Sequence, residues 1–180
     1  MLRLLYAVIL GLIGAGIVHV AVLLLIPDIS DRDVWSKLQS ASELYKTTRL
    51  DSAPGSPPIV KSIDPLFSAA ACRFDLNDGV LRVTGQGHTP FWSVSVYNRA
   101  GENIYSFNDH TLARGGVDFS VATPTQMIEV RKEFPDGTGN SIYVETASEE
   151  GIVVVRSFVP DPSWKKSVSD FLDGISCMPE

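Results

Sequence analysis

The chain has 180 residues, of which 44% are hydrophobic and 20% are charged, and its formal net charge at pH 7 is −6. Lys and Arg are outnumbered by Asp and Glu, 15 against 21, and form no basic run. This acidic balance argues against binding to nucleic acid and against docking on an anionic lipid surface.

The first element is an apolar segment, residues 4–26, without a charged side chain. At about 1.5 Å per residue, a helix over this segment is roughly 34 Å long, enough to cross a hydrocarbon core of about 30 Å. A cleavable signal peptide is the alternative reading, but the apolar stretch is long for one and no small-x-small site follows Leu25. We therefore expect an uncleaved signal-anchor that spans the lipid bilayer.

The charges that flank this segment do not set its orientation, because only Arg3 precedes it and only Arg32 and Lys37 follow it closely. A tail of residues 1–3 is easiest to leave in the cytoplasm, which places the rest of the chain outside. Pro27 is expected to end the helix.

Small residues recur every four positions within the segment, at Ala7, Gly11 and Ala15, and His19 continues the same stripe. Such spacing lets two membrane helices approach closely, and a polar group at bilayer depth prefers a protein neighbour. The alternative is a lone anchor in which His19 points toward the interface.

A membrane-proximal region follows at residues 27–50. Ser30 and Asp33 resemble a capping pair, and Val34, Leu38, Ala41 and Tyr45 recur at helical spacing, which predicts an amphipathic helix over about 31–47. Residues 51–58 have the Pro, Ser and Gly composition of a linker. The remaining residues, 59–180, are expected to form the globular domain.

Apolar residues then alternate with polar ones, which predicts strands. Residues 72–76 alternate in this way, and Asn77-Asp78-Gly79 predicts a tight turn into residues 80–83 and hence a hairpin. Further strands are expected at 92–97, 104–107, 117–122, 126–133, 141–147 and 151–159. The predicted fold class is mostly β, an antiparallel sandwich or curled sheet.

A C-terminal helix completes the predicted domain. Asp161 fits an N-cap and Pro162 the first helical position, and an apolar stripe follows at Trp164, Val168, Phe171, Leu172 and Ile175. This stripe is expected to lie against the sheet.

The two cysteines, Cys72 and Cys177, show no metal-ligand spacing. In an oxidising compartment they are a candidate disulfide that closes a loop of about 105 residues and ties the C-terminal helix to the first strand. The alternative is two buried thiols in a reducing compartment.

No catalytic residues, metal site or cofactor is predicted. Ser163 and Lys166 match S-x-x-K, a motif of penicillin-recognising serine enzymes, but its companion motifs are missing and a solvated helix face explains the match. His88, Asp109 and His110 lie in expected loops, where a metal or acid–base role competes with ordinary loop polarity.

Five aromatic residues occur on the two adjacent strands after residue 90, namely Phe91, Trp92, Tyr97, Tyr105 and Phe107. Most are expected to fill the core. Phe91 and Tyr97 share the face opposite Trp92, and together with Tyr105 they are the candidate binding face for a sugar ring or an apolar segment of a partner.

Five stretches together resemble a known family: AACRFDL (70–76), PFWSVSVY (90–97), YSFND (105–109), ATPTQM (122–127) and VVRSFVPD (154–161). They are similar to the short, single-pass envelope proteins of Gram-negative bacteria related to the domain of unknown function 1254. That family implies no catalytic residues. Its longer relatives carry a second domain of unknown function, the 1214 class, so a companion membrane protein of that class, or another envelope protein, is an expected partner.

These observations favour a non-catalytic interaction domain in an envelope complex, anchored in the inner membrane with its C-terminal domain in the periplasm. A small-molecule or glycan-binding module that uses the aromatic face is the alternative. An enzyme built from His88, Asp109 and His110 is the third hypothesis.

Overall fold

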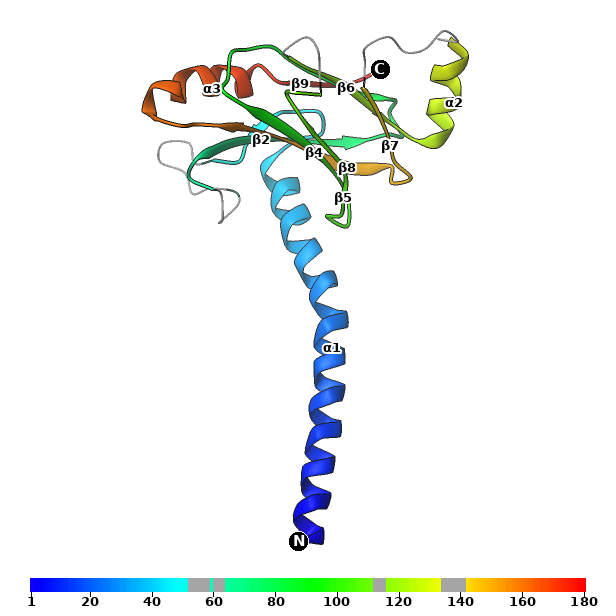
Figure 1. The fold of residues 1–180 in the computed structure, drawn as a ribbon. Coiled ribbons are helices and arrows are strands. Elements are labelled where there is room, and N and C mark those ends of the chain that lie inside the picture. Colours follow the sequence, from blue (N-terminus) through cyan, green and yellow to red (C-terminus); the bar gives the residue numbers. More distant parts are fainter. Residues whose placement is uncertain (52–58, 60–63, 112–115, 134–141) are drawn as a thin grey trace.

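A computed structural model of the chain describes residues 1–51, 59, 64–111, 116–133 and 142–180, with the side chains of residues 26–34 and 36 left out of the description. It shows a long N-terminal helix attached to a domain of two packed sheets (Figure 1). Helix and strand contribute about equally to the described residues, so the chain is mixed α/β rather than mostly β. The prediction of packed sheets with a C-terminal helix is confirmed.

The N-terminal helix, α1 (Leu2–Ala41), is continuous for 40 residues. The prediction that Pro27 ends the membrane helix is therefore wrong. A proline removes one helical hydrogen bond, but here the apolar run precedes it and Trp35 and Leu38 are buried after it, so both flanks favour a helix. The helix ends six residues before the predicted boundary, and Tyr45, predicted on its apolar face, lies beyond it with a φ of 60°.

The first sheet, sheet A, contains five antiparallel strands in the order β1-β2-β8-β4-β5. These are β1 (Thr48–Arg49), β2 (Phe67–Asp75), β8 (Glu150–Phe158), β4 (Trp92–Asn98) and β5 (Asn103–Asn108). Since β1 pairs with β2, the sheet includes residues that precede the predicted linker, most of which (52–58) lies outside the described residues.

The second sheet, sheet B, has the order β7-β6-β3-β9, formed by β7 (Ile142–Glu145), β6 (Val117–Ala122), β3 (Leu81–Gly85) and β9 (Ser176–Pro179). β6 and β7 are parallel, so this sheet is not wholly antiparallel as predicted. The predicted hairpin is also wrong, because β2 and β3 belong to different sheets. Gly79 has a φ of 144°, and its turn carries the chain from one sheet to the other.

A short helix, α2 (Pro124–Glu133), replaces the strand predicted at 126–133. The Gln126 side chain accepts a hydrogen bond from the Thr123 N–H at 2.8 Å, and the Thr123 hydroxyl accepts one from the Gln126 N–H at 3.3 Å. This reciprocal pair is a capping box, followed by a proline at the first helical position. Thr123-Pro124-Thr125-Gln126 therefore contained the signal for a helix, and the alternation of apolar residues did not reveal it.

The C-terminal helix forms as predicted. Asp161 accepts a hydrogen bond from the Ser163 N–H at 2.8 Å and caps η1 (Pro162–Trp164), which leads into α3 (Lys165–Asp173). Val168, Phe171 and Leu172 of the predicted stripe are buried. Ile175 is also buried, but it lies beyond the helix.

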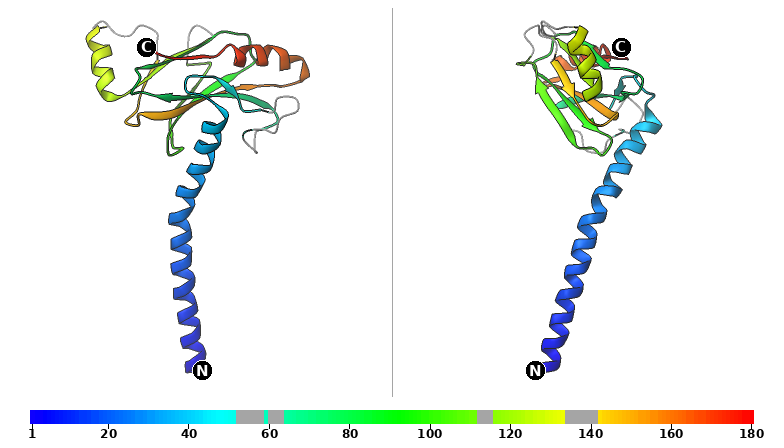
Figure 2. Two further views of the ribbon diagram at one scale, coloured as in Figure 1. Left: turned by 180° about the vertical axis from the view of Figure 1, so that it is seen from behind. Right: turned by 90° about the vertical axis from the view of Figure 1, so that its right-hand side faces the viewer.

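The main core lies between the two sheets and under α3. Its largest fully buried side chains include Phe74 from sheet A, Phe119 from sheet B and Phe171 from α3. Sheet B and α3 form one layer over the inner face of sheet A, while α1 approaches from the other side (Figure 2). Sheet A is therefore covered on both faces, by the core on one and in part by α1 on the other.

We predict that Gly151→Ala destabilises the domain by about 1–3 kcal/mol, because overpacking forces neighbouring groups to move. A Cβ at this position would overlap the Phe74 ring and the Tyr97 carbonyl oxygen. Chemical denaturation of the full chain in detergent measures the free energy of unfolding. Gly174→Ala is the comparison: its Cβ would lie 3.3 Å from the Asp170 carbonyl oxygen, a smaller overlap that should cost less, and an equal loss in both variants would contradict the prediction.

Candidate functional site

The last turns of α1 pack on the outer face of sheet A. Trp35 and Leu38 are only 8% and 4% exposed, and they form a second apolar cluster with Ala69, Ala71 and Ile152. Leu50, from the segment after β1, belongs to the same cluster. We call this contact the helix–sheet junction; it fixes the direction in which α1 leaves the domain.

A buried arginine lies at the centre of the helix–sheet junction. Arg73 of β2 is 7% exposed, its guanidinium lies 5.0 Å from the centre of the Trp35 ring, and its Nη1 donates to the Ser42 carbonyl at 3.1 Å. Ser42 is the C-cap of α1, where the helix dipole places partial negative charge. The positive charge of the guanidinium thus lies close to two sites of partial negative charge, the face of the Trp35 ring and the C-terminal end of α1.

Arg99 approaches the same ring from the β4–β5 turn, with its guanidinium 5.6 Å from the ring centre. It also pairs with Glu150 at the start of β8. Two arginines therefore meet one tryptophan, and the turn between β4 and β5 is linked to the end of α1.

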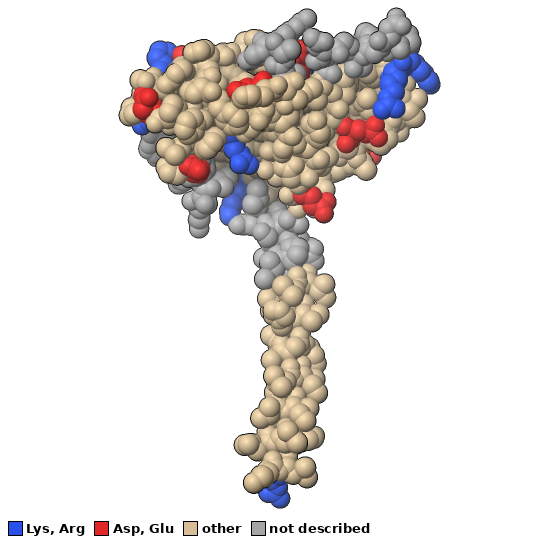
Figure 3. All heavy atoms as spheres, viewed as in Figure 1, with Lys and Arg blue, Asp and Glu red and all other residues tan. Residues whose placement is uncertain are grey.

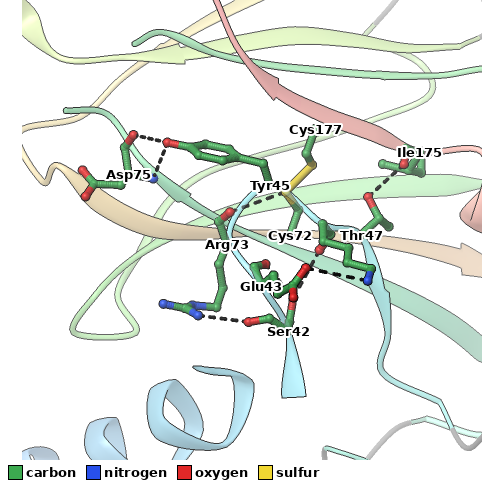
Figure 4. The surroundings of a disulfide bond; sticks show 10 residues. Ser42, Glu43, Tyr45, Thr47, Cys72, Arg73, Asp75, Ile175 and Cys177 are labelled. Atoms are coloured by element: carbon green, nitrogen blue, oxygen red, sulfur yellow. Dashed lines mark hydrogen bonds and ion pairs between the residues drawn. A yellow bond between two sulfur atoms is a disulfide. The ribbon is translucent and has the colours of Figure 1, made fainter. Parts of the chain in front are cut away.

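The chain after α1 stays against the domain (Figure 4). The Tyr45 N–H donates to the Arg73 carbonyl at 2.9 Å, and the Tyr45 hydroxyl donates to the Asp78 carboxylate at 2.7 Å. Burial, together with the hydrogen bond to Asp78, raises the pKa of Tyr45 to about 12. The neutral phenol is thus the form that the fold favours.

Two further residues fasten this segment to the C-terminal part of the chain. The Thr47 hydroxyl donates to the Ile175 carbonyl at 2.8 Å, and Arg49 bridges Asp51 at 2.6 Å and Asp173 at 3.1 Å. Although burial opposes ionisation, Arg49 holds the pKa of Asp51 below its usual value. The connection from α1 to the domain is therefore made of specific polar contacts.

Cys72 and Cys177 form a disulfide, with their Cα atoms 6.6 Å apart (Figure 4). The bond joins β2 of sheet A to β9 of sheet B and is buried in the core. Cys177 was expected just beyond the C-terminal helix; it lies in a strand, because the chain turns at Gly174 and adds an edge to sheet B.

The three candidate aromatic residues do not share one face. Tyr97 lies on the outer face of sheet A, where its hydroxyl accepts from Arg156 at 3.1 Å. Tyr105 is paired with the core residue Val96, so it lies on the opposite face, with its ring 5.9 Å from that of Phe107. Phe91 is half-buried just before β4. A single flat ligand cannot cover all three rings.

The polar loop candidates His88, Asp109 and His110 do not lie together either. The His88 ring lies 5.4 Å from the Trp164 ring beside α3, whereas His110 contacts Asp109 at 3.2 Å after β5. Within the described ranges, no group of three or more His, Cys, Asp and Glu side chains is placed to hold a metal ion.

An open cleft of about 500 Å³ lies between the loop after β3 and α3. It contains both residues of the S-x-x-K match. The Ser163 hydroxyl donates to Asp161 at 2.6 Å, and the hydrogen bond to Asp170 raises the pKa of Lys166. A raised pKa keeps the lysine protonated, which is the reverse of what a catalytic base needs. The cleft is lined by Gln86, Gly87, His88, Ser163, Lys166, Ser167, Asp170 and Phe171.

The apolar part of α1 extends below the domain and shows charged side chains only near its N-terminal tip, where Arg3 lies (Figure 3). Residues Leu2–Leu25 are long and apolar enough to cross a bilayer, and none of this span is buried by the other described residues. The small-residue stripe is therefore open along the helix, and a Cβ at Gly11 would meet nothing within 4 Å.

Comparison with known proteins gives a fold but no family. No protein-family model matches the chain, and no curated protein matches it. The VPA0106 protein from Vibrio parahaemolyticus has a similar structure, with a TM-score of 0.61 and 12% identity over 83% of this chain and 34% of that one. A putative uncharacterized protein from Burkholderia cenocepacia matches 74% of this chain and 37% of its own, at 13% identity and a TM-score of 0.47.

The chain thus spans about a third of the length of each of these two proteins. At 12% identity, the likeness to the Vibrio protein establishes a shared fold and transfers no activity. The apolar helix and the disulfide, taken together, indicate an extracytoplasmic location for the domain.

We predict that the Tyr45 hydroxyl makes the domain sensitive to alkali. Because the pKa is raised from 10.0 to about 12, this stabilisation is complete below pH 10 and is lost as the pH rises toward 12. Tyr45→Phe should lower the free energy of unfolding at neutral pH by about 1 kcal/mol through the lost hydrogen bonds. The difference between the two proteins should then shrink above pH 10. Denaturant titrations across this range test it, and a difference that stays constant contradicts it.

Proposed function

We propose that the protein is a non-catalytic interaction domain of an envelope complex, anchored in the inner membrane by α1 and exposed to the periplasm, with residues 1–3 in the cytoplasm. One observation carries the proposal. The helix that contains the apolar span continues without interruption to Trp35 and Leu38, which are buried on sheet A. The domain therefore has a fixed position relative to its anchor, as a docking platform requires.

The contacts of the helix–sheet junction support a positional role. Arg73 and Arg99 on Trp35, and Arg49 with its two carboxylates, resist bending where the anchor meets the domain. An enzyme that diffuses to its substrate gains nothing from such a joint. A domain that must meet partners at a set height above the membrane depends on it.

A companion membrane protein is the partner we propose. The resemblance to proteins related to the domain of unknown function 1254 supports a companion of the 1214 class. The shared fold covers only 34% of the structurally similar Vibrio protein, so in that protein this fold occurs together with a large additional part. We propose that the stripe of Ala7, Gly11, Ala15 and His19 contacts a helix of this companion.

A periplasmic small-molecule or glycan-binding module is the second candidate. The observation that favours it is the cleft beside α3, where the His88 and Phe171 side chains lie with the hydroxyl groups of Ser163 and Ser167. Stacking rings together with hydroxyl groups suit a sugar. The aromatic residues Phe91, Tyr97 and Tyr105 give this alternative less support because they lie on different faces.

We predict that both cysteines are protected in the cell. Spheroplasts are treated with a permeant alkylating agent before lysis, and the full chain is mapped without reductant. In a periplasmic domain, Cys72 and Cys177 should be recovered as one linked peptide pair, because thiols in the cytoplasm are kept reduced. Added protease should remove the domain from intact spheroplasts but spare a cytoplasmic marker. Alkylated cysteines in a protease-resistant domain would contradict the proposed topology.

We also predict that a companion membrane protein co-purifies with the chain from gentle detergent, as detected by mass spectrometry. Gly11→Ile should reduce its recovery severalfold, because a branched side chain separates the two helices. Gly16→Ile is the matched control: it makes the same change away from the stripe, and Gly16 also has open space around its Cβ. Equal recovery from both variants would remove the stripe from the proposal, and a chain that purifies alone would contradict the companion.

A further inference from the structure

The two cysteines of the buried disulfide lie in strands that are held to very different degrees. Cys72 belongs to β2, which is buried at six of its nine residues and pairs with β8 along its full length and with β1 near its middle. Cys177 belongs to β9, where it is the single buried residue of four. Among the described strands, β9 is an edge of sheet B and pairs with β3 alone. A strand held by so few buried contacts opens more easily than one in the middle of a sheet.

The contacts on either side of β9 define the unit that opens. Before the strand, Ile175 is buried and its carbonyl accepts the hydrogen bond from Thr47, so the chain is fixed up to this residue (Figure 4). After the strand, Glu180 exchanges two backbone hydrogen bonds with Val80, at 2.8 and 3.0 Å, and its carboxylate pairs with Arg82 at 3.1 Å. Both side chains of that ion pair are well exposed, so it adds little stability. The segment that follows Ile175 is therefore the opening unit.

Opening of this segment treats the two sulfur atoms differently. In the closed domain Cys72 and Cys177 are 2% and 3% exposed, so an external reagent reaches neither. When β9 opens, it carries Cys177 into solvent, whereas Cys72 stays on the core face of sheet A in a strand that remains paired on both sides. Thiol–disulfide exchange requires direct attack of one sulfur on another, so access decides which sulfur reacts. Access favours Cys177.

We propose that Cys177 is the exchange site of this chain, the residue on which a dithiol oxidoreductase of the envelope forms its mixed disulfide while it installs the buried bond. The inference rests on the proposed periplasmic location, because disulfides form and persist in oxidising compartments. The class of partner follows from the chemistry: joining two thiols removes two electrons from the chain, and the disulfide of an oxidoreductase accepts two electrons. The site goes beyond the proposed contact with a companion and uses a different part of the domain.

The exchange takes place in two steps. With β9 open, the Cys177 thiolate attacks one sulfur of the oxidant's disulfide; the mixed disulfide forms, and the oxidant's other sulfur leaves as a thiolate that takes up the proton lost by Cys177. As β9 returns to β3, the Cys72 thiolate attacks the Cys177 sulfur, the buried bond forms, and the oxidant's first sulfur leaves and takes up the proton lost by Cys72. Two thiols of the chain are oxidised, and the oxidant's disulfide is reduced to two thiols. The completed bond then joins β9 to β2 and keeps the segment closed.

The experiment compares two single-cysteine variants of the full chain in detergent. Cys72→Ala leaves Cys177 free and Cys177→Ala leaves Cys72 free, so both variants lose the same bond. With oxidised glutathione under native conditions, mass spectrometry should detect the mixed disulfide roughly tenfold faster in Cys72→Ala. Equal rates, or faster reaction of Cys72, would overturn the inference, because both sulfurs would then be reached by unfolding of the whole domain. Pulse alkylation of the reduced natural sequence makes the same comparison without a substitution, and Cys177 should be labelled first.

A second pair of variants tests whether it is β9 that opens. In the Cys72→Ala chain, Arg82→Gln removes the ion pair that holds the segment after β9 and should raise the rate at Cys177 roughly two- to fivefold. Arg131→Gln is the matched control, because it removes an exposed ion pair with Glu145 at the opposite edge of sheet B, on β7. The control should leave the rate unchanged. The same rate in Arg82→Gln and Arg131→Gln would overturn the opening of β9 as the route to Cys177.

Trapping in cells identifies the partner. The Cys72→Ala chain lacks the cysteine that resolves the mixed disulfide, so acid quenching followed by a non-reducing gel should show an adduct with a second protein that reductant removes. Cys177→Ala should show no such adduct, and an adduct on that variant instead would overturn the inference. The protease treatment of spheroplasts reports the location separately. Absence of an adduct on a Cys72→Ala chain whose domain is open to protease would therefore overturn the exchange site and leave the proposed location intact.

Discussion

The architecture depends on the contact between the end of α1 and the outer face of sheet A. Among the described residues, none buries the apolar part of α1, and it is the last turns of the helix that pack on the domain. Trp35 supplies apolar area, and Arg73 compensates the negative end of the helix from within the sheet. Without the Trp35 ring or the Arg73 guanidinium, α1 would remain covalently linked to the domain, but its direction relative to sheet A would no longer be fixed.

The same contact explains why the segment after α1 is so strongly fixed. The chain must turn sharply to enter sheet A, and Tyr45 makes this turn with a positive φ that few side chains adopt. Its hydroxyl and backbone bonds to the region around Asp75 and Asp78 compensate that strain. Arg49 then joins the segment to α3, while the disulfide between β2 and β9 holds the two sheets together. The N-terminal helix, the two sheets and the C-terminal helix are thus coupled within a few residues.

The sequence revealed what depends on local chemistry. The apolar span, the cap at Asp161 and the buried face of α3 follow from residue types at fixed spacings, and the structure confirms them. One local signal was missed, the capping box that begins α2 at Thr123. The other features that the sequence did not reveal depend on distant contacts. Whether Pro27 ends a helix depends on the face of sheet A on which Trp35 packs. The turn at Gly79 connects two sheets because β2 pairs with β8, which begins about 70 residues later in the chain, and not with β3. The burial of Arg73 at the helix–sheet junction could not be predicted from the sequence, since a charged residue in an alternating strand normally faces water.

The faces and edges of sheet A are covered to different extents by the rest of the described chain. One face is filled by the core, and the β2 and β8 side of the other face is filled by α1. The β5 side is left with an uncharged edge, an open Tyr105 and polar outer residues such as Ser95 and Ser106, whose hydroxyls bond to each other at 2.9 Å. Under the proposed membrane anchoring, α1 holds the domain on one side of sheet A and restricts its approach to other surfaces, which favours contacts on the β5 side.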